Sequence, residues 1–173
     1  MDYTVPEKSI EEVQADLTKR FMHFENPKDR YKYLIDMGKQ LQNLDDSYQT
    51  EENRIHGCQS QVWIHIEENN GRLFMQAKSD AAIVSGLIAL LLRIYNGRTP
   101  QEVATAPLDF LGKIGLLQQL SPNRSTGLYH MIKRIQAEGQ KRAVELNADA
   151  AGITAGLAIV GGGENAVVQL SES

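Results

Sequence analysis

The chain has 173 residues, of which 42% are hydrophobic and 23% charged, with 18 basic side chains against 22 acidic ones. This length suits one globular domain, and the ordinary composition excludes a collagenous, coiled-coil or wholly disordered chain. The net charge of -4 argues against nucleic acid or an anionic membrane as the main partner, since both attract clustered Lys and Arg. A single cysteine excludes an intrachain disulfide and a multi-cysteine metal site.

The first part of the chain predicts two helices followed by a loop. Ser9 and Glu12 form a capping box in front of a helix-spaced apolar set, and Asn26-Pro27 marks the start of a second helix. The polar stretch from Asn43 to Arg54 is typical of an exposed loop.

The next segment predicts a β-hairpin. Apolar residues alternate from Val62 to Glu67, which is the period of a strand with one buried face. Asn69-Asn70-Gly71 is a turn signal, and Leu73 to Ala77 supplies the partner strand.

Several helices follow the hairpin. Ser79-Asp80 is expected to cap a largely apolar helix that begins at Ala81 and ends at Asn96-Gly97. Three further helices are predicted after it. One begins at the Thr99–Glu102 capping box, one is the apolar segment from Pro107, and the last, a long one, follows Ser121-Pro122. Consecutive strands among helices indicate an α+β fold, with a small antiparallel sheet packed against several helices.

The sequence predicts neither a signal peptide nor a membrane span. The acidic N-terminus is unlike a signal peptide, and the most apolar window, Ala81 to Leu92, falls short of the roughly twenty residues that a membrane span needs. We therefore expect a cytoplasmic protein that does not enter a membrane.

The composition shifts to Ala, Gly and Val from about Ala143, which divides the chain into a main domain at 1–142 and an extension at 143–173. Within the extension, Leu157–Val160 and Ala166–Leu170 flank a Gly161–Asn165 loop, so either a β-hairpin or a flexible tail is expected.

Cys58 is the main candidate for chemistry. It lies among Gly, Gln, Ser and His residues rather than in an apolar run, and Gly57 permits a sharp turn that could present the thiol. The thiol would become nucleophilic if its pKa fell toward neutrality, with His56 as a candidate base. The remaining histidines, His23, His65 and His130, form no metal-ligand spacing, so no metal site is expected.

Four stretches of sequence resemble the SufE family of sulfur-acceptor proteins. They are Gly57-Cys58-Gln59-Ser60-Gln61-Val62-Trp63, the run from Ser79 to Ala89, and the segments Thr99–Glu102 and Leu120–Leu128. The resemblance covers about residues 10–141. It implies a SufE/NifU-like fold in which Cys58 accepts sulfane sulfur from a PLP-dependent, SufS-like cysteine desulfurase and passes it to a SufBCD-like scaffold for iron–sulfur cluster assembly.

The same resemblance implies supporting roles around Cys58. Gln59 and Ser60 would shape the loop, Trp63 would anchor the first strand beneath it, Asp80 would lie beside it, and Arg124 would steady the same region. A helix cap at Asp80 and an ion pair at Arg124 are equally simple explanations. The chain would need no cofactor, because the PLP belongs to the desulfurase, and it would act as a carrier and activator rather than a stand-alone enzyme.

Other interpretations stay open on sequence alone. A CsdE-like carrier would serve another desulfurase and acceptor, a hydrolase or peroxidase would use Cys58 with His56 as base, and an interaction domain would leave the thiol idle. The sequence is compatible with a monomer or a homodimer.

Overall fold

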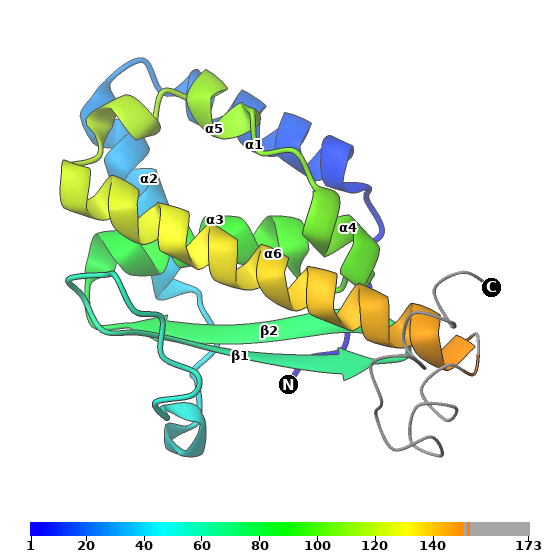
Figure 1. The fold of residues 1–173 in the computed structure, drawn as a ribbon. Helices are drawn as coiled ribbons and strands as arrows, with labels where there is room; N and C mark the ends of the chain where they lie inside the picture. Colours follow the sequence, from blue (N-terminus) through cyan, green and yellow to red (C-terminus); the bar gives the residue numbers. More distant parts are fainter. Residues whose placement is uncertain (151, 153–173) are drawn as a thin grey trace.

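The computed structural model describes residues 1–150 and residue 152 (Figure 1). The elements occur in the order α1 (Ile10–His23), α2 (Pro27–Lys39), the 3₁₀ helix η1 (Asp46–Tyr48), β1 (Val62–Asn69), β2 (Arg72–Ser79), α3 (Ala82–Tyr95), α4 (Pro100–Thr105), α5 (Phe110–Lys113), the 3₁₀ helix η2 (Leu117–Gln119) and α6 (Pro122–Ala150).

The predicted starts of α1, α2 and α4 are confirmed, because each depends on a bond within one turn. Ser9 Oγ accepts the Glu12 N–H at 3.1 Å, and the Glu12 carboxylate accepts the Ser9 N–H in return. Asn26 Oδ1 accepts the Lys28 N–H at 2.9 Å, and Thr99 and Glu102 complete the second capping box. These side chains satisfy N–H groups that a helix start leaves without intrahelical partners.

The hairpin is confirmed as a two-stranded antiparallel sheet, with pairing from Val62–Ser79 to Asn69–Arg72. Its core face consists of buried apolar residues at every second position, namely Val62, Ile64, Leu73, Met75 and Ala77. Helices lie against this face, so the fold is α+β as expected.

Helix α3 is the centre of the core. Ten of its residues are buried, and it contacts α1, α2, α6 and β2. Figure 1 shows α6 crossing in front of α3 above the sheet, with α1 and α5 farther from the strands. Within the described residues, no helix is both long enough and apolar enough to cross a membrane.

The stretch from Asn43 to Arg54 is not a simple exposed loop. Leu44 is buried, the Tyr48 ring stacks on His65 of β1 with centroids 3.7 Å apart, and Arg54 forms a β-bridge with Trp63. The polar composition of this stretch gave no sign of its buried leucine or of its two contacts with the sheet.

Helix α6 extends past the predicted domain boundary at 142/143 and continues to Ala150. The first residues of the predicted extension therefore belong to the same helix as the last residues of the main domain. The predicted hairpin around Gly161–Asn165 lies outside the described residues.

Candidate functional site

Cys58 lies in a loop, residues 56–61, that projects from the end of the sheet. The Ile55 N–H donates to the Val62 carbonyl at 2.9 Å and closes the base of the loop. The Ile64 N–H donates to the Asn53 carbonyl at 2.8 Å, so residues 53–55 run along the outer edge of β1. Gly57 turns the loop with a φ of +88°, a conformation that side chains rarely adopt.

Asp80 anchors the other end of this loop. Its Oδ1 accepts the Gln61 N–H at 3.0 Å, and the Asp80 N–H donates to the Gln61 carbonyl at 3.4 Å. The predicted Ser79-Asp80 helix cap is wrong, because α3 starts after Ala81 and has no side-chain cap bond. The carboxylate bonds across the hairpin instead, to Gln61, the last residue of the cysteine loop.

Replacing Asp80 with alanine should loosen the loop. Because one hydrogen bond contributes on the order of 1 kcal/mol, we expect alkylation of Cys58 by iodoacetamide to become about fivefold faster. Asp109→Ala is the matched control, since Asp109 is a carboxylate with no side-chain cap bond. An alkylation rate that is equal in the two variants would show that Asp80 does not restrain the thiol.

The Cys58 side chain is half-buried against α6. Its Sγ donates to the Gly127 carbonyl at 3.7 Å, and a Cβ added to Gly127 would lie 3.4 Å from that sulfur. Burial raises the pKa of the Cys58 thiol, which is opposite to the lowered pKa expected for an exposed nucleophile. In this conformation the thiol is therefore held protonated and partly screened from solvent.

Three distant segments meet around the thiol and form a cleft of about 310 Å³. The loop, the start of α3 and the first turns of α6 supply its lining, which consists of Cys58, Gln59, Ser60, Ala81, Ile83, Val84, Ser121, Asn123, Arg124, Gly127 and Met131. The structure thus brings the predicted residues Cys58, Gln59, Ser60 and Arg124 together. Sequence reasoning had not singled out Asn123 or Gly127, although both lie in the block that contains Arg124.

Three predicted site residues, Gly57, Trp63 and Asp80, lie outside the lining. Trp63 alternates with the buried Val62 and Ile64, so its side chain points to the opposite face of β1. Its backbone pairs with Lys78 of β2 on one side and forms a β-bridge with Arg54. Gly57 contributes its backbone turn, packed against His130.

His56 is exposed, and its Nε2 lies 2.9 Å from Glu51 Oε1. Cys58 has a different hydrogen-bond partner, the Gly127 carbonyl. The suggested pairing of His56 with Cys58 is therefore not formed in this structure. Among residues 1–150 and 152, no group of three or more His, Cys, Asp or Glu side chains is placed to hold a metal ion.

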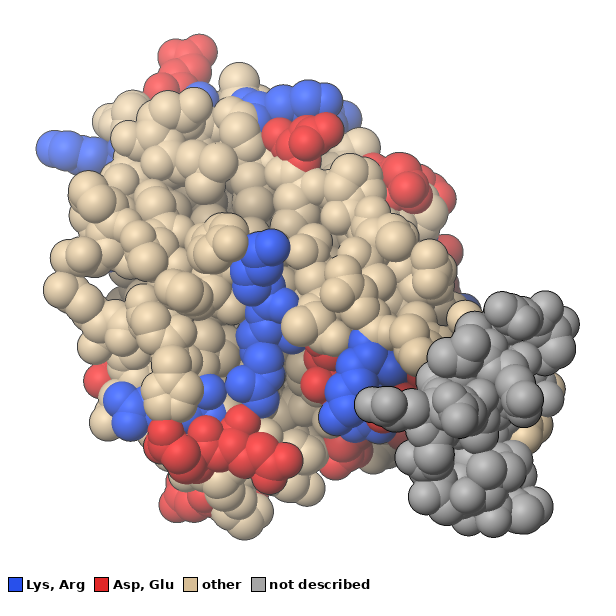
Figure 2. Space-filling model, viewed as in Figure 1, with Lys and Arg blue, Asp and Glu red and all other residues tan. Residues whose placement is uncertain are grey.

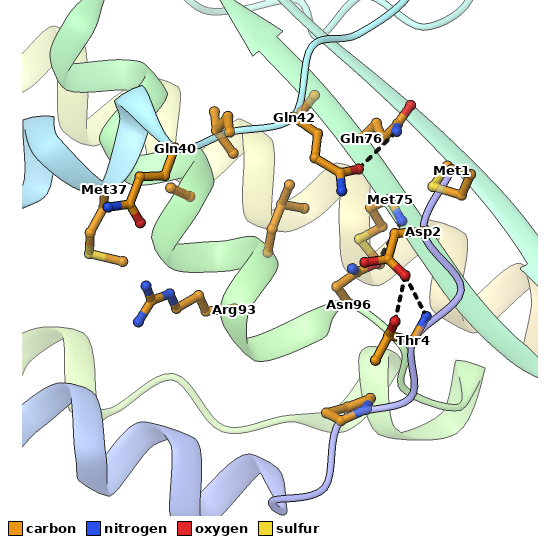
Figure 3. Close-up of a pocket in the computed structure, with 15 residues that line it drawn as sticks. Met1, Asp2, Thr4, Met37, Gln40, Gln42, Met75, Gln76, Arg93 and Asn96 are labelled. Atoms are coloured by element: carbon orange, nitrogen blue, oxygen red, sulfur yellow. Dashed lines mark hydrogen bonds between the residues drawn. The ribbon is translucent and has the colours of Figure 1, made fainter.

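A second cavity, of about 370 Å³, lies between the N-terminal segment, the end of α2, β2 and α3 (Figure 3). Asp2 Oδ1 accepts hydrogen bonds from the Thr4 N–H and from the Thr4 hydroxyl, and the Gln76 amide donates to Gln42 Oε1 at 3.1 Å. Its lining, as far as the structure describes it, includes neither cysteine nor histidine. The Cys58 cleft is therefore the candidate site.

Known proteins that are similar to this chain indicate its family. A family model described as "SufE: Fe-S metabolism associated domain" matches residues 15–139. An uncharacterized SufE-like protein of Rhizobium meliloti (strain 1021) is 39% identical over 127 residues, which cover 70% of this chain and 91% of that protein. A second uncharacterized SufE-like protein, from Rhizobium etli, is 40% identical over 128 residues, covering 71% and 86%.

The fold also resembles the solution structure of a hypothetical protein from Thermus thermophilus. The TM-score is 0.65 at 22% identity, and the match covers 82% of this chain and 99% of the other. At this identity the likeness supports the fold alone, whereas the family match and the two relatives support more. Together they show that this chain belongs to the SufE family, whose role is sulfur transfer in Fe–S metabolism.

Proposed function

We propose that this protein is a persulfide carrier. Cys58 accepts sulfane sulfur from a SufS-like cysteine desulfurase, stimulates that enzyme, and delivers the sulfur to a SufBCD-like scaffold in the cytoplasm. The observation that carries the proposal is the placement of the chain's single thiol, half-buried in a cleft that is built from three segments.

The transfer involves three sulfur atoms: the Cys58 sulfur, the sulfur of the donor cysteine, and the outer sulfur that moves from one to the other. The Cys58 thiolate attacks the outer sulfur of the desulfurase persulfide, and a new S–S bond forms on Cys58. The donor's S–S bond breaks, its electron pair stays on the donor cysteine, and the proton lost by Cys58 neutralises that thiolate. No external oxidant or reductant is consumed, so the chain requires no cofactor, and the PLP belongs to the desulfurase.

Partial burial suits a carrier of a labile group. A persulfide in open solvent is readily removed by reductants, whereas the cleft would screen one on Cys58. The same burial raises the pKa of the thiol, so the resting protein holds few thiolates. Movement of the loop toward a partner would expose the thiol and bring its pKa back toward the usual value, which couples sulfur acceptance to docking.

The contacts give less support to a hydrolase. A cysteine hydrolase needs a base within hydrogen-bond reach of the thiol and a third group that orients the base. Here the only described histidine–carboxylate pair near the loop, His56 with Glu51, has no hydrogen bond to Cys58.

The test is to incubate the protein with a PLP-loaded SufS-like desulfurase and cysteine, and then to measure its mass. We expect a gain of about 32 Da on the peptide that contains Cys58, lost again on treatment with a reducing agent. We also expect the desulfurase to turn over faster in the presence of the protein. No mass gain and no stimulation would contradict the proposal.

A further inference from the structure

One face of α6 contacts the whole segment that leads to the cysteine. Gly127, His130 and Arg134 are spaced three and four residues apart, so they lie on the same face of the helix. Arg134 donates hydrogen bonds to the carbonyls of residues 52 and 54, and His130 packs on Gly57. The Gly127 carbonyl accepts a hydrogen bond from the Cys58 thiol. Three successive contacts thus follow the chain from residue 52 to the thiol.

We propose that His130 and Arg134 are positioning residues that hold residues 52–58 against α6 and so keep the Cys58 sulfur turned into its cleft. The assignment follows from their contacts with the segment. Its consequence for sulfur transfer rests on the proposed function.

His130 positions the turn at Gly57 by direct packing of its imidazole ring. A Cβ placed on Gly57 would stand 2.5 Å from both Cδ2 and Nε2 of His130, so the bare backbone of the turn lies directly on the imidazole ring. The ring is half-buried, and it meets Tyr129 edge-on with centroids 5.5 Å apart. Removing the ring would take away the surface on which the turn before Cys58 lies.

Arg134 acts through hydrogen bonds. Its Nη2 donates to the Glu52 carbonyl at 2.7 Å, and its Nη1 donates to the Arg54 carbonyl at 3.5 Å. A guanidinium holds two donors in a fixed plane, which lets one side chain bridge two carbonyls, whereas a lysine ammonium is a single point charge. Figure 2 shows a column of basic side chains crossing the middle of α6 toward an acidic group below it.

These contacts are separate from those at the base of the loop. The bond from Ile55 to Val62 and the bond from Gln61 to Asp80 involve neither His130 nor Arg134. Losing the α6 contacts should therefore release the tip of the loop, including the Cys58–Gly127 contact, while the sheet stays paired.

The experiment compares His130→Ala, Arg134→Ala and Arg134→Lys in the full chain. We expect iodoacetamide to alkylate Cys58 about fivefold faster in each alanine variant, and about twofold faster in Arg134→Lys, which can still reach one carbonyl. Lys133→Ala is the control, because Lys133 is exposed with its Nζ 5.5 Å from the Tyr129 ring centroid. The control should react at the rate of the unmodified protein.

Amide hydrogen exchange separates positioning from general destabilisation. Faster exchange confined to residues 52–61, with β2 unchanged, would support the proposal. Unchanged alkylation in both alanine variants, or faster exchange spread equally over β2, would overturn it. Alkylation requires no desulfurase, so a failure of sulfur acceptance would count against the proposed function and leave this inference standing.

Discussion

Replacing Cys58 with serine is expected to abolish sulfur acceptance completely. The chain has one cysteine, so no second thiol can take over the role. A serine hydroxyl does not ionise near neutral pH and forms no stable bond with sulfane sulfur, so the gain of about 32 Da should disappear. Stimulation of the desulfurase should disappear as well, because no acceptor thiol removes the outer sulfur from the desulfurase persulfide.

The fold should survive this substitution. A hydroxyl can donate to the Gly127 carbonyl as the thiol does, and the side chain becomes slightly smaller. Ser47→Ala is the control, because Ser47 is exposed in η1 and lies outside the cleft lining, and it should keep the full mass gain. Sulfur uptake by the Cys58→Ser protein, or stimulation at the unmodified level, would contradict the carrier role.

The parts of the fold that were predictable from sequence are those determined by local chemistry. The Ser9 and Thr99 capping boxes and the Asn26 cap are bonds within one helical turn, so the residue pattern is sufficient to place them. The alternation after Val62 likewise predicts a strand with one buried face, as observed. The predicted helix cap at Asp80 is wrong because its carboxylate could accept a bond either from the helix start beside it or from the Gln61 N–H across the hairpin. The bond from Gln61 is the one that forms.

The candidate site was only partly predictable for a similar reason. The polar block around Cys58 and its resemblance to SufE proteins identified the reactive residue, but the wall of the cleft comes from α6, far along the chain from the cysteine. No spacing rule places Gly127 against the sulfur or His130 against Gly57. The direction of the thiol pKa shift was not predictable from the sequence either, because it depends on burial in the folded protein.

The close contact between α2 and α3 leads to the largest predicted effect on stability. The backbones of the two helices approach at Gly38 and Gly86. A Cβ on Gly86 would overlap the Leu34 carbonyl oxygen and stand 2.8 Å from the carbonyl carbon, and a Cβ on Gly38 would lie 2.6 Å from the Gly86 nitrogen. The atoms in the way are backbone, so no side-chain rotation relieves the clash.

Gly86→Ala is therefore expected to destabilise the protein. Alanine improves helix propensity by about 1 kcal/mol, but forcing two packed helices apart costs more, and we expect a net loss of about 2 kcal/mol. For a chain of this size such a loss lowers the melting temperature by about 4–8 °C. The measurement is urea and thermal unfolding followed by circular dichroism.

Gly112→Ala provides the control for this substitution. Gly112 lies in α5, and a Cβ added there meets nothing within 4 Å. Alanine at that position gains helix propensity without a clash, so its stability should equal or exceed that of the unmodified protein by up to about 1 kcal/mol. If Gly86→Ala proved as stable as Gly112→Ala, α2 would be free to move away from α3, and the rigid core that supports the start of α3 beside the Cys58 cleft would have to be reconsidered.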